Sequence, residues 1–311
     1  METTLDVPIH TEPASPRHFA PGVERVSIVF VNAYLVGDPG GSWVLVDTGL
    51  PGFASRVQHA AEKRFGRDRP PEAIILTHGH FDHAGSAAEL GRRWETTVFA
   101  HPLELPFLTG RSDYPPQDPT VGGALGFLSR TFPHTGIDLG GGVRPLPRDG
   151  TLPGIPGWRW IHTPGHTAGH VSLFRDADRV LLAGDAFATL NQDSAIAMIT
   201  QRREFSVPPA PLTTDWDAAH TSVRHLASLR PSAISAGHGL PVRGPRVASD
   251  LERFAEMFQR PRTGRYVGQP ARSGENGVDY VPPPVSDPLP RQLLLGGIAA
   301  AALIAVTRRR S

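Results

Sequence analysis

Three histidines and one aspartate fall within six residues of this chain, in the segment His78-Gly79-His80-Phe81-Asp82-His83, which directly follows the apolar run Ile74–Leu76. Imidazole nitrogens and carboxylate oxygens are ligand types that zinc prefers. Alternate residues of an extended stretch point the same way, so His78 and His80 can share one metal ion. Asp82 and His83 lie past the bend and could bind a second ion. The segment therefore predicts a two-metal hydrolytic centre whose remaining ligands come from elsewhere.

Three later strand-like runs each end at a further residue that could bind metal. The run Trp158–His162 leads into Thr163-Pro164-Gly165-His166-Thr167-Ala168-Gly169-His170, Val180–Ala183 leads into Gly184-Asp185, and Ala233–Ser235 leads into Gly237-His238-Gly239. A glycine beside each of these residues lets the backbone bend tightly and approach a site closely. Proteins of the α/β class gather their chemistry where several strands end. We therefore expect these residues to meet at one site.

These motifs, together with Asn32-Ala33-Tyr34 and Val46-Asp47-Thr48-Gly49, resemble the metallo-β-lactamase superfamily, and most of all its glyoxalase-II-like hydrolase branch. The resemblance runs from about Val23 to Arg246 and includes five motifs in the family's order. It implies an α/β fold, the αββα sandwich of the metallo-β-lactamase type, and the activity of a metal-dependent hydrolase.

Carried over position by position, the resemblance implies a complete set of site residues. One metal ion would bind His78, His80 and His166, the second would bind Asp82, His83 and His238, and Asp185 would bridge the two. The implied cofactor is two zinc ions per chain, with a metal-bridged hydroxide that attacks an ester, lactone or thioester carbonyl. The catalytic carboxylates are Asp82, which takes part in proton transfer, and Asp185. Asp47 and Thr77 resemble residues that orient the ligands, and His170 fits the motif without being a ligand in the family pattern, so we expect it to be structural or to hydrogen-bond near the site.

Departures from named branches of the superfamily leave the substrate open. Lys63 is the only lysine, which counts against a glutathione thioester held by basic residues. Ala188 stands where the resemblance to acyl-homoserine lactonases would place a tyrosine. The alternative function is that of a persulfide dioxygenase-like oxidoreductase with a single iron. The presence of His238, which completes the second ligand set, favours the hydrolase.

Composition excludes several other classes of protein and site. The chain has 311 residues and a formal net charge of +1. Since no basic excess is present to neutralise phosphates, we expect a small-molecule substrate and no nucleic-acid partner. Cysteine is absent, so disulfides, thiolate ligands and a cysteine nucleophile are all excluded.

The elements that must position these residues follow from turn signals and apolar patterning. We expect strands at Arg25–Val31 and Trp43–Val46, paired antiparallel across the turn Gly37–Gly41, and a strand at Ala73–Thr77 that leads into the first motif. The sequence predicts helices at the ranges Phe53–Phe65, Ala84–Arg93, Asp217–Leu229 and Val247–Gln259. The Pro- and Gly-rich stretch Leu105–Pro147 carries aromatic residues that favour an ordered lid over a disordered insertion.

Outside the catalytic domain, which we place at residues 21–260, the chain predicts three further segments: an N-terminal lead-in at 1–20, a Pro-rich linker at 261–291, and a short apolar tail at 292–311 that ends in arginines. The tail holds 14 consecutive uncharged residues, Leu293–Val306. As a helix they would span about 21 Å, less than the roughly 30 Å hydrocarbon core of a bilayer. The absence of a polar face favours a membrane contact over a docked helix. Because the lead-in lacks the pattern of a secretory signal, we expect a cytoplasmic protein, tethered to the membrane at its C-terminus if the tail inserts.

Overall fold

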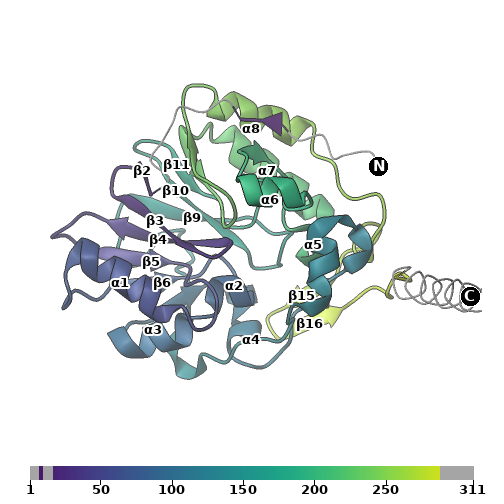
Figure 1. Ribbon diagram of the computed structural model, residues 1–311. Coiled ribbons are helices and arrows are strands. Elements are labelled where there is room, and N and C mark those ends of the chain that lie inside the picture. The colour runs from purple at the N-terminus through teal and green to yellow at the C-terminus, as the bar shows by residue number, and fades with distance from the viewer. Residues whose placement is uncertain (1–6, 10–16, 288–311) are drawn as a thin grey trace, which may run out of the picture.

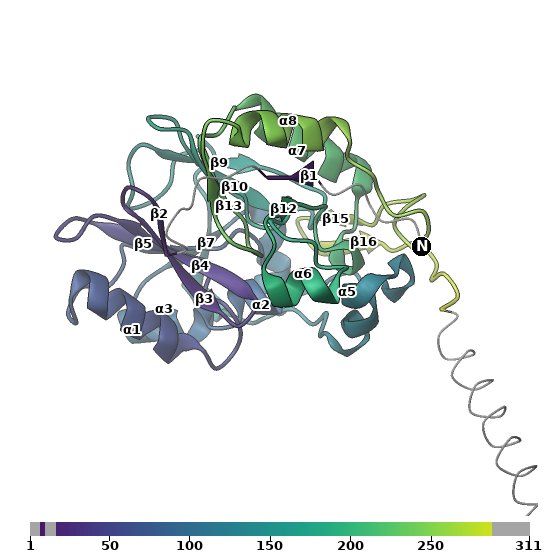
Figure 2. The same cartoon turned by 45° about the horizontal axis from the view of Figure 1, so that its top comes forward.

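The two larger β-sheets of the molecule face each other, and helices cover their outer sides (Figure 1). The computed structural model describes residues 7–9 and 17–287. Figures 1 and 2 show α1 and α3 on the outer side of the first sheet, and α7 and α8 on the outer side of the second. This is the expected αββα sandwich.

The first sheet has the strand order β2-β3-β4-β5-β6-β7-β8. Its strands are antiparallel from β2 to β5 and parallel from β5 to β8. Their bounds are β2 His18–Ala20, β3 Val23–Ile28, β4 Val31–Gly37, β5 Trp43–Val46, β6 Ala73–Ile75, β7 Val98–Ala100 and β8 Val143–Pro145.

The second sheet has the order β14-β13-β11-β10-β9, in which β11 and β13 are parallel and the other pairs antiparallel. Its strands are β9 Trp158–His162, β10 Val171–Arg175, β11 Val180–Leu182, β13 Ala233–Ser235 and β14 Val242–Arg243. Two smaller pairs join β1 Val7–Pro8 to β12 Glu204–Phe205, and β15 Arg272–Gly274 to β16 Gly277–Tyr280.

Helices cover the sheets and fill the connections. The longer ones are α1 Ala54–Phe65, α3 Ala87–Trp94, α7 Trp216–Ser228 and α8 Val247–Glu256. Shorter ones are α2 Phe81–Ala84, α4 Leu105–Leu108, α5 Gly123–Leu128 and α6 Ala195–Thr200, with 3₁₀ turns η1 Pro102–Glu104, η2 Pro119–Val121, η3 Ser129–Thr131, η4 Gly140–Gly142 and η5 Ala210–Leu212. The sequence predictions for α1, α7 and α8 agree with these bounds to within a few residues.

The hydrophobic core forms three layers that match the sandwich. The central layer joins the inner faces of the sheets, with Val44 and Ile75 from the first and Leu173 and Leu182 from the second. One outer layer packs α1 and α3 on the first sheet, and the other packs α7 and α8 on the second. The alternation of side chains along each strand supplies both faces of each sheet, so burial on both sides fixes the register of the strands.

The expected strand Arg25–Val31 was wrong, because the chain reverses inside it. β3 ends at Ile28, Val29 and Phe30 form an exposed turn, and β4 returns from Val31. Trp43–Val46 therefore pairs with β4 and not with the expected run. Val29 has a φ of 58°, a left-handed conformation that β-branched residues rarely adopt, so no turn signal marks this position in the sequence.

The stretch expected as a lid is folded and is contacted by the segment expected as a linker. α4, α5 and the 3₁₀ turns η2, η3 and η4 lie within it. Tyr266 is buried and its hydroxyl donates to Pro116 O at 2.5 Å, while the amide of Val278 donates to Ser112 Oγ at 3.2 Å. The predicted apolar tail lies outside the described residues. Within the described ranges, no helix combines the length and apolar character needed to cross a membrane.

Candidate metal centre

Seven histidines and aspartates meet where strands of both sheets end. The loop after β6 carries His78 and His80, and α2 carries Asp82 and His83. The loops after β9, β11 and β13 supply His166, Asp185 and His238. All seven side chains are buried, and the most accessible, His80, is only 6% exposed. The structure thus brings together every residue that the sequence proposed as a metal ligand.

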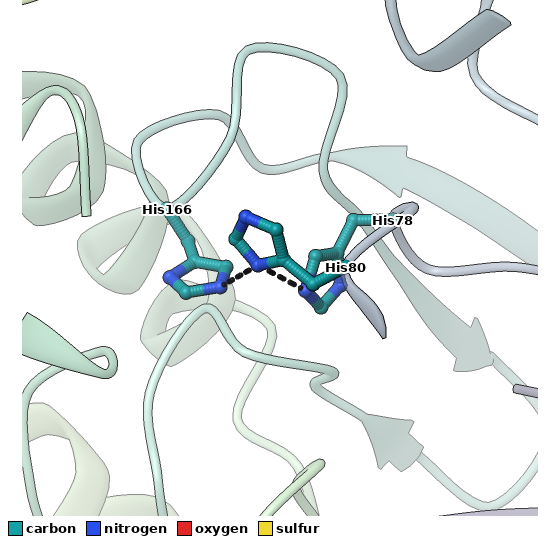
Figure 3. Close-up of side chains that lie close together, drawn as sticks. All are labelled: His78, His80 and His166. Atoms are coloured by element: carbon teal, nitrogen blue, oxygen red, sulfur yellow. Dashed lines mark hydrogen bonds between the residues drawn. The ribbon is translucent and has the colours of Figure 1, made fainter. Parts of the chain in front are cut away.

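The first group consists of His78, His80 and His166, whose rings turn toward one another in Figure 3. His80 Nδ1 lies 3.0 Å from His78 Nε2 and 3.0 Å from His166 Nε2. Three ring nitrogens at this separation surround a space of the size that a tetrahedral metal ion occupies.

Asp185 joins this group to the others. Its Oδ2 lies 3.6 Å from His166 Nε2, 3.4 Å from His83 Nε2 and 3.2 Å from His238 Nε2. Asp82 Oδ2 is 3.5 Å from His238 Nε2. Among the described residues, two further sets could hold a metal ion, namely His78 with His83 and Asp185, and Asp82 with His83 and His238. One carboxylate oxygen is therefore within reach of both halves of the centre.

Four of the histidines make a hydrogen bond through Nδ1, which points away from the centre, and this bond orients their Nε2 toward the centre. The Nδ1–H of His83 donates to Asp47 Oδ2 at 2.9 Å, and that of His238 donates to Phe30 O at 2.9 Å. The Thr77 hydroxyl donates to Asp47, so it accepts from His78 Nδ1 at 3.1 Å. Likewise Thr213 donates to Pro209 O and accepts from His166 Nδ1 at 3.3 Å. Each of these four rings consequently presents an Nε2 lone pair to the centre, the tautomer that metal binding requires.

Two buried polar atoms at the centre lack a hydrogen bond, although one of them, His83 Nε2, lies 3.4 Å from Asp185 Oδ2. His83 Nε2 and Asp185 Oδ1 make no hydrogen bond to any residue in the described part of the chain. Buried polar groups are almost always satisfied, and a site for an ion is one explanation of an exception. Together with the donor set of histidine nitrogens and carboxylate oxygens, these atoms fit a zinc-type centre.

Burial and nearby charges shift the pKa values of the five histidines in two directions: three are lowered and two are raised. Burial lowers the pKa of His80 to about 3 and holds the pKa values of His78 and His166 well below the usual range. Burial also opposes the charged forms of His83 and His238, but the nearby carboxylates, Asp185 first, outweigh it and raise the pKa of both. His238 and His83 in turn hold the pKa of Asp185 well below its usual range. The centre is therefore built around an anionic carboxylate, and a bound cation would replace the protons that it attracts.

Asp47 and His170 lie just outside the seven candidate ligands and hydrogen-bond to the side chain of one and the backbone of another. Asp47 accepts from His83 and also from the amide of Thr77 at 2.8 Å, so it connects the end of β5 to the first motif. His170 Nδ1 donates to Thr163 O at 3.1 Å, and its Nε2 accepts from the amide of Asp185 at 2.8 Å. His170 thus fixes the backbone that carries the central carboxylate.

Gly237 approaches the centre so closely that no other residue fits there. A Cβ at this position would collide with Asp185 Oδ1 and lie 2.6 Å from His83 Cε1. The glycine beside His238 is thus required by space rather than by an unusual backbone conformation.

Sequence reasoning missed three residues that contact the candidate ligands or their loops: Thr213, Phe30 through its carbonyl, and Glu104. Glu104 is fully buried in η1 and accepts from the amides of Gly79 and Gly169. Thr213 and Phe30 lie in loops that carry no recognisable motif. For Glu104 the sequence does hold a signal, an acidic residue within the apolar run Pro102-Leu103-Glu104-Leu105-Pro106-Phe107-Leu108.

A family sequence pattern, related sequences and a solved structure all indicate the same protein family. The sequence pattern of the Metallo-beta-lactamase superfamily matches residues 26–238. The chain is 43% identical over 242 residues to the probable metallo-hydrolase YflN of Bacillus subtilis, a match that covers 77% of this chain and 92% of that protein. It is 26% identical to a hydroxyacylglutathione hydrolase of Halorhodospira halophila over 64% of this chain and 60% of that enzyme. A B3 metallo-β-lactamase with an active-site glutamic acid has a similar fold, with a TM-score of 0.52, 22% identity, and coverage of 76% of this chain and 84% of its own.

Proposed function

Because the chain belongs to the metallo-β-lactamase superfamily and is a metal-dependent hydrolase, we propose that it is a binuclear zinc hydrolase of carboxylic esters, lactones or thioesters. The observation that carries this proposal is the position of Asp185, whose Oδ2 lies within 3.6 Å of His83, His166 and His238. A carboxylate shared by two histidine groups is the arrangement that a pair of metal ions needs.

In this proposal each group of residues holds one ion. His78, His80 and His166 would hold the first, Asp82, His83 and His238 would hold the second, and Asp185 would be shared between the two groups. Zinc ions bound there would supply a hydroxide nucleophile near neutral pH and polarise the substrate carbonyl.

The chain's own residues then orient the centre and move protons. Asp47 holds the His83 ring in the tautomer that faces the site, at 2.9 Å. We assign proton transfer during turnover to the carboxyl of Asp82, which is buried within the centre. Asp82 is also only 3.5 Å from His238, so a proton that it accepts remains inside the centre.

The test is metal analysis together with two substitutions. We expect the purified protein to hold about two zinc ions per chain and to hydrolyse a simple aryl ester. His80→Ala and Asp185→Ala should each lower that activity at least about 100-fold, with a circular dichroism spectrum like that of the wild type. Wild-type activity in either variant after complete metal removal would overturn the proposal.

The same metal analysis separates this function from the single-iron alternative. One iron per chain, with oxygen uptake that depends on a persulfide, would identify a dioxygenase. The presence of a complete Asp82, His83 and His238 group favours two ions, since a one-metal enzyme would not need it. Turnover of lactones, thioesters and β-lactams, measured side by side, then assigns the substrate class.

A further inference from the structure

We propose that Glu104 is a positioning residue whose buried carboxylate holds together the two loops that carry His78, His80 and His166. It would thereby set the affinity of this first group for metal. The inference rests on the proposed function in that it takes these three histidines as ligands. Glu104 itself lies behind the loops and acts on the metal site only through them.

The carboxylate accepts hydrogen bonds from four groups of the described chain, two on each oxygen. Oε2 accepts from the amide of Gly79 at 3.0 Å and from the hydroxyl of Tyr114. Oε1 accepts from the hydroxyl of Thr167 at 2.7 Å and from the amide of Gly169 at 3.0 Å. Each oxygen therefore pairs one backbone amide with one hydroxyl, and we call Glu104 with these four donors the Glu104 clamp.

The clamp connects segments that are distant in the sequence and adjacent in the centre. Gly79 lies between His78 and His80 in the loop after β6, which belongs to the first sheet. Thr167 and Gly169 follow His166 in the loop after β9, which belongs to the second sheet. Glu104 comes from η1, after β7. One side chain thus sets the separation of two loops whose histidine nitrogens must stay about 3.0 Å apart.

The donors around Glu104 suit a carboxylate and no other side chain. Two of them are backbone amides, which can only donate, and the carboxylate is the one group with two oxygens that both accept. Glu104 is fully buried and has no ion-pair partner among the described residues. Hydrogen bonds to an ionised acceptor are roughly twice as strong as neutral ones. A carboxylate at position 104 therefore holds the two loops more firmly than the side-chain amide of a glutamine would.

Tyr114 extends the clamp to the ring of His80. Its own ring lies 4.5 Å from that of His80 at 58°, and stacks on Phe107 at 4.1 Å and 19°. A Cβ on Gly79 would collide with its hydroxyl. The loop therefore rests directly on Tyr114, whose hydroxyl is held by Glu104. A shift of the carboxylate would move both the backbone and the ring contact of His80.

The experiment compares metal affinity in Glu104→Gln and Glu24→Gln. The first substitution keeps the shape of the side chain but presents an NH₂ group to one amide and one hydroxyl donor, so the clamp should open. Glu24 is also buried, pairs with Arg17 and Arg64, and is not among the residues of the centre, so it is the matched control. By competition with a zinc chelator we expect Glu104→Gln to lose between about 10-fold and 100-fold in affinity for one ion, and Glu24→Gln to keep the wild-type affinity.

A second measurement needs neither metal nor substrate. In the metal-free protein, hydrogen exchange at one of the two amides, that of Gly79 or that of Gly169, should be faster in Glu104→Gln than in Glu24→Gln, because the amide that faces the new NH₂ group loses its acceptor. If Glu104→Gln does not fold, Tyr114→Phe keeps the ring on His80 and removes one donor, and it should show a smaller change in the same direction. Unchanged exchange together with zinc affinity within about twofold of the wild type would overturn the clamp. A wild-type protein that binds zinc but hydrolyses no ester would instead overturn the proposed function, leaving the clamp measurable.

Discussion

His101 shows how a single side chain outside the centre is tied to the loops that form it. Its Nδ1 accepts from the amide of Leu103 at 3.2 Å and so caps η1, the turn that carries Glu104. Its ring stacks on His162 at 4.2 Å and 8°, and His162 Nε2 donates to Ala168 O at 2.8 Å. Burial, with a smaller effect from His162, lowers the pKa of His101 to about 4. The cap therefore depends on a neutral imidazole.

This dependence predicts a change of stability with pH. In the unfolded chain His101 gains a proton below about pH 6.5, whereas in the folded protein its pKa is about 4 and it gains the proton only near that pH. The unfolded state thus binds more protons across this window, and the free energy of unfolding falls as the pH drops from about 6.5 to 4. His101→Asn keeps an acceptor at the cap and cannot titrate, so its stability should fall less over this window.

Urea unfolding of the metal-free proteins at several pH values between about 7 and 4.5 measures the effect. His59→Asn, a change at an exposed histidine of α1, is the matched control and should follow the wild type. If His101→Asn and the wild type lose stability in parallel, the cap does not titrate as proposed.

At this residue scale, a large part of the centre could be predicted and the rest could not. The seven candidate ligands were found because they lie in short motifs that follow strands, and five of them, His78, His80, His166, Asp185 and His238, stand directly beside a glycine. Glu104 and Thr213 act through contacts between segments far apart in the sequence, and their own neighbours carry no such pattern. A buried acceptor is identified by the donors that surround it, and only the fold brings those donors together.

Among the elements, the turn between β3 and β4 contacts the candidate metal centre through Phe30, which lies against His238. The carbonyl of Phe30 accepts from His238, and the Phe30 ring stacks on the His238 ring at 6.1 Å and 20°. Yet Phe30 is 47% exposed, and Val29 is 65% exposed. An exposed aromatic residue beside a candidate ligand offers an apolar surface to a substrate that approaches the centre.

We therefore predict that Phe30→Ala raises KM for aryl esters with long acyl chains by roughly 10-fold, equivalent to about 1.4 kcal/mol of apolar contact, with a smaller effect on kcat. The backbone carbonyl that orients His238 is retained in this variant. Steady-state kinetics on a series from acetate to octanoate provide the check, and the short acetate ester is the internal control. An equal loss for all chain lengths would contradict apolar substrate contact and would indicate a disturbed His238.

The elements themselves followed from the sequence where apolar patterning and turn residues agree. The strands Trp158–His162 and Ala233–Ser235 and the helix α7 have nearly the predicted bounds. The β3–β4 turn was missed because Val29 and Phe30 look like strand residues, and the contact of Phe30 O with His238 joins segments far apart in the sequence. The β15–β16 pair was also not predicted, since its Gly-rich surroundings resemble a linker until the packing of Tyr266 is seen.

At the scale of the whole molecule, the centre lies across the interface of the sandwich. His78, His80, Asp82 and His83 follow β6 of the first sheet, whereas His166, Asp185 and His238 follow β9, β11 and β13 of the second. Bound metal would therefore connect the two sheets as well as supply chemistry. Without it, the mutual repulsion and unsatisfied atoms of a buried polar cluster oppose the packing of the same interface.

Metal removal should consequently destabilise the entire fold rather than a single loop. With free zinc at about 1,000 times its dissociation constant, ligand linkage contributes about 4 kcal/mol to the free energy of unfolding. At roughly 2 °C per kcal/mol for a domain of this size, chelation should lower the Tm by about 8 °C. Calorimetry with and without chelator measures this shift, and Asp185→Ala, which lacks the shared carboxylate, should show a much smaller one. An equal shift in both proteins would mean that the chelator acts elsewhere and that the sheets are not joined through this centre.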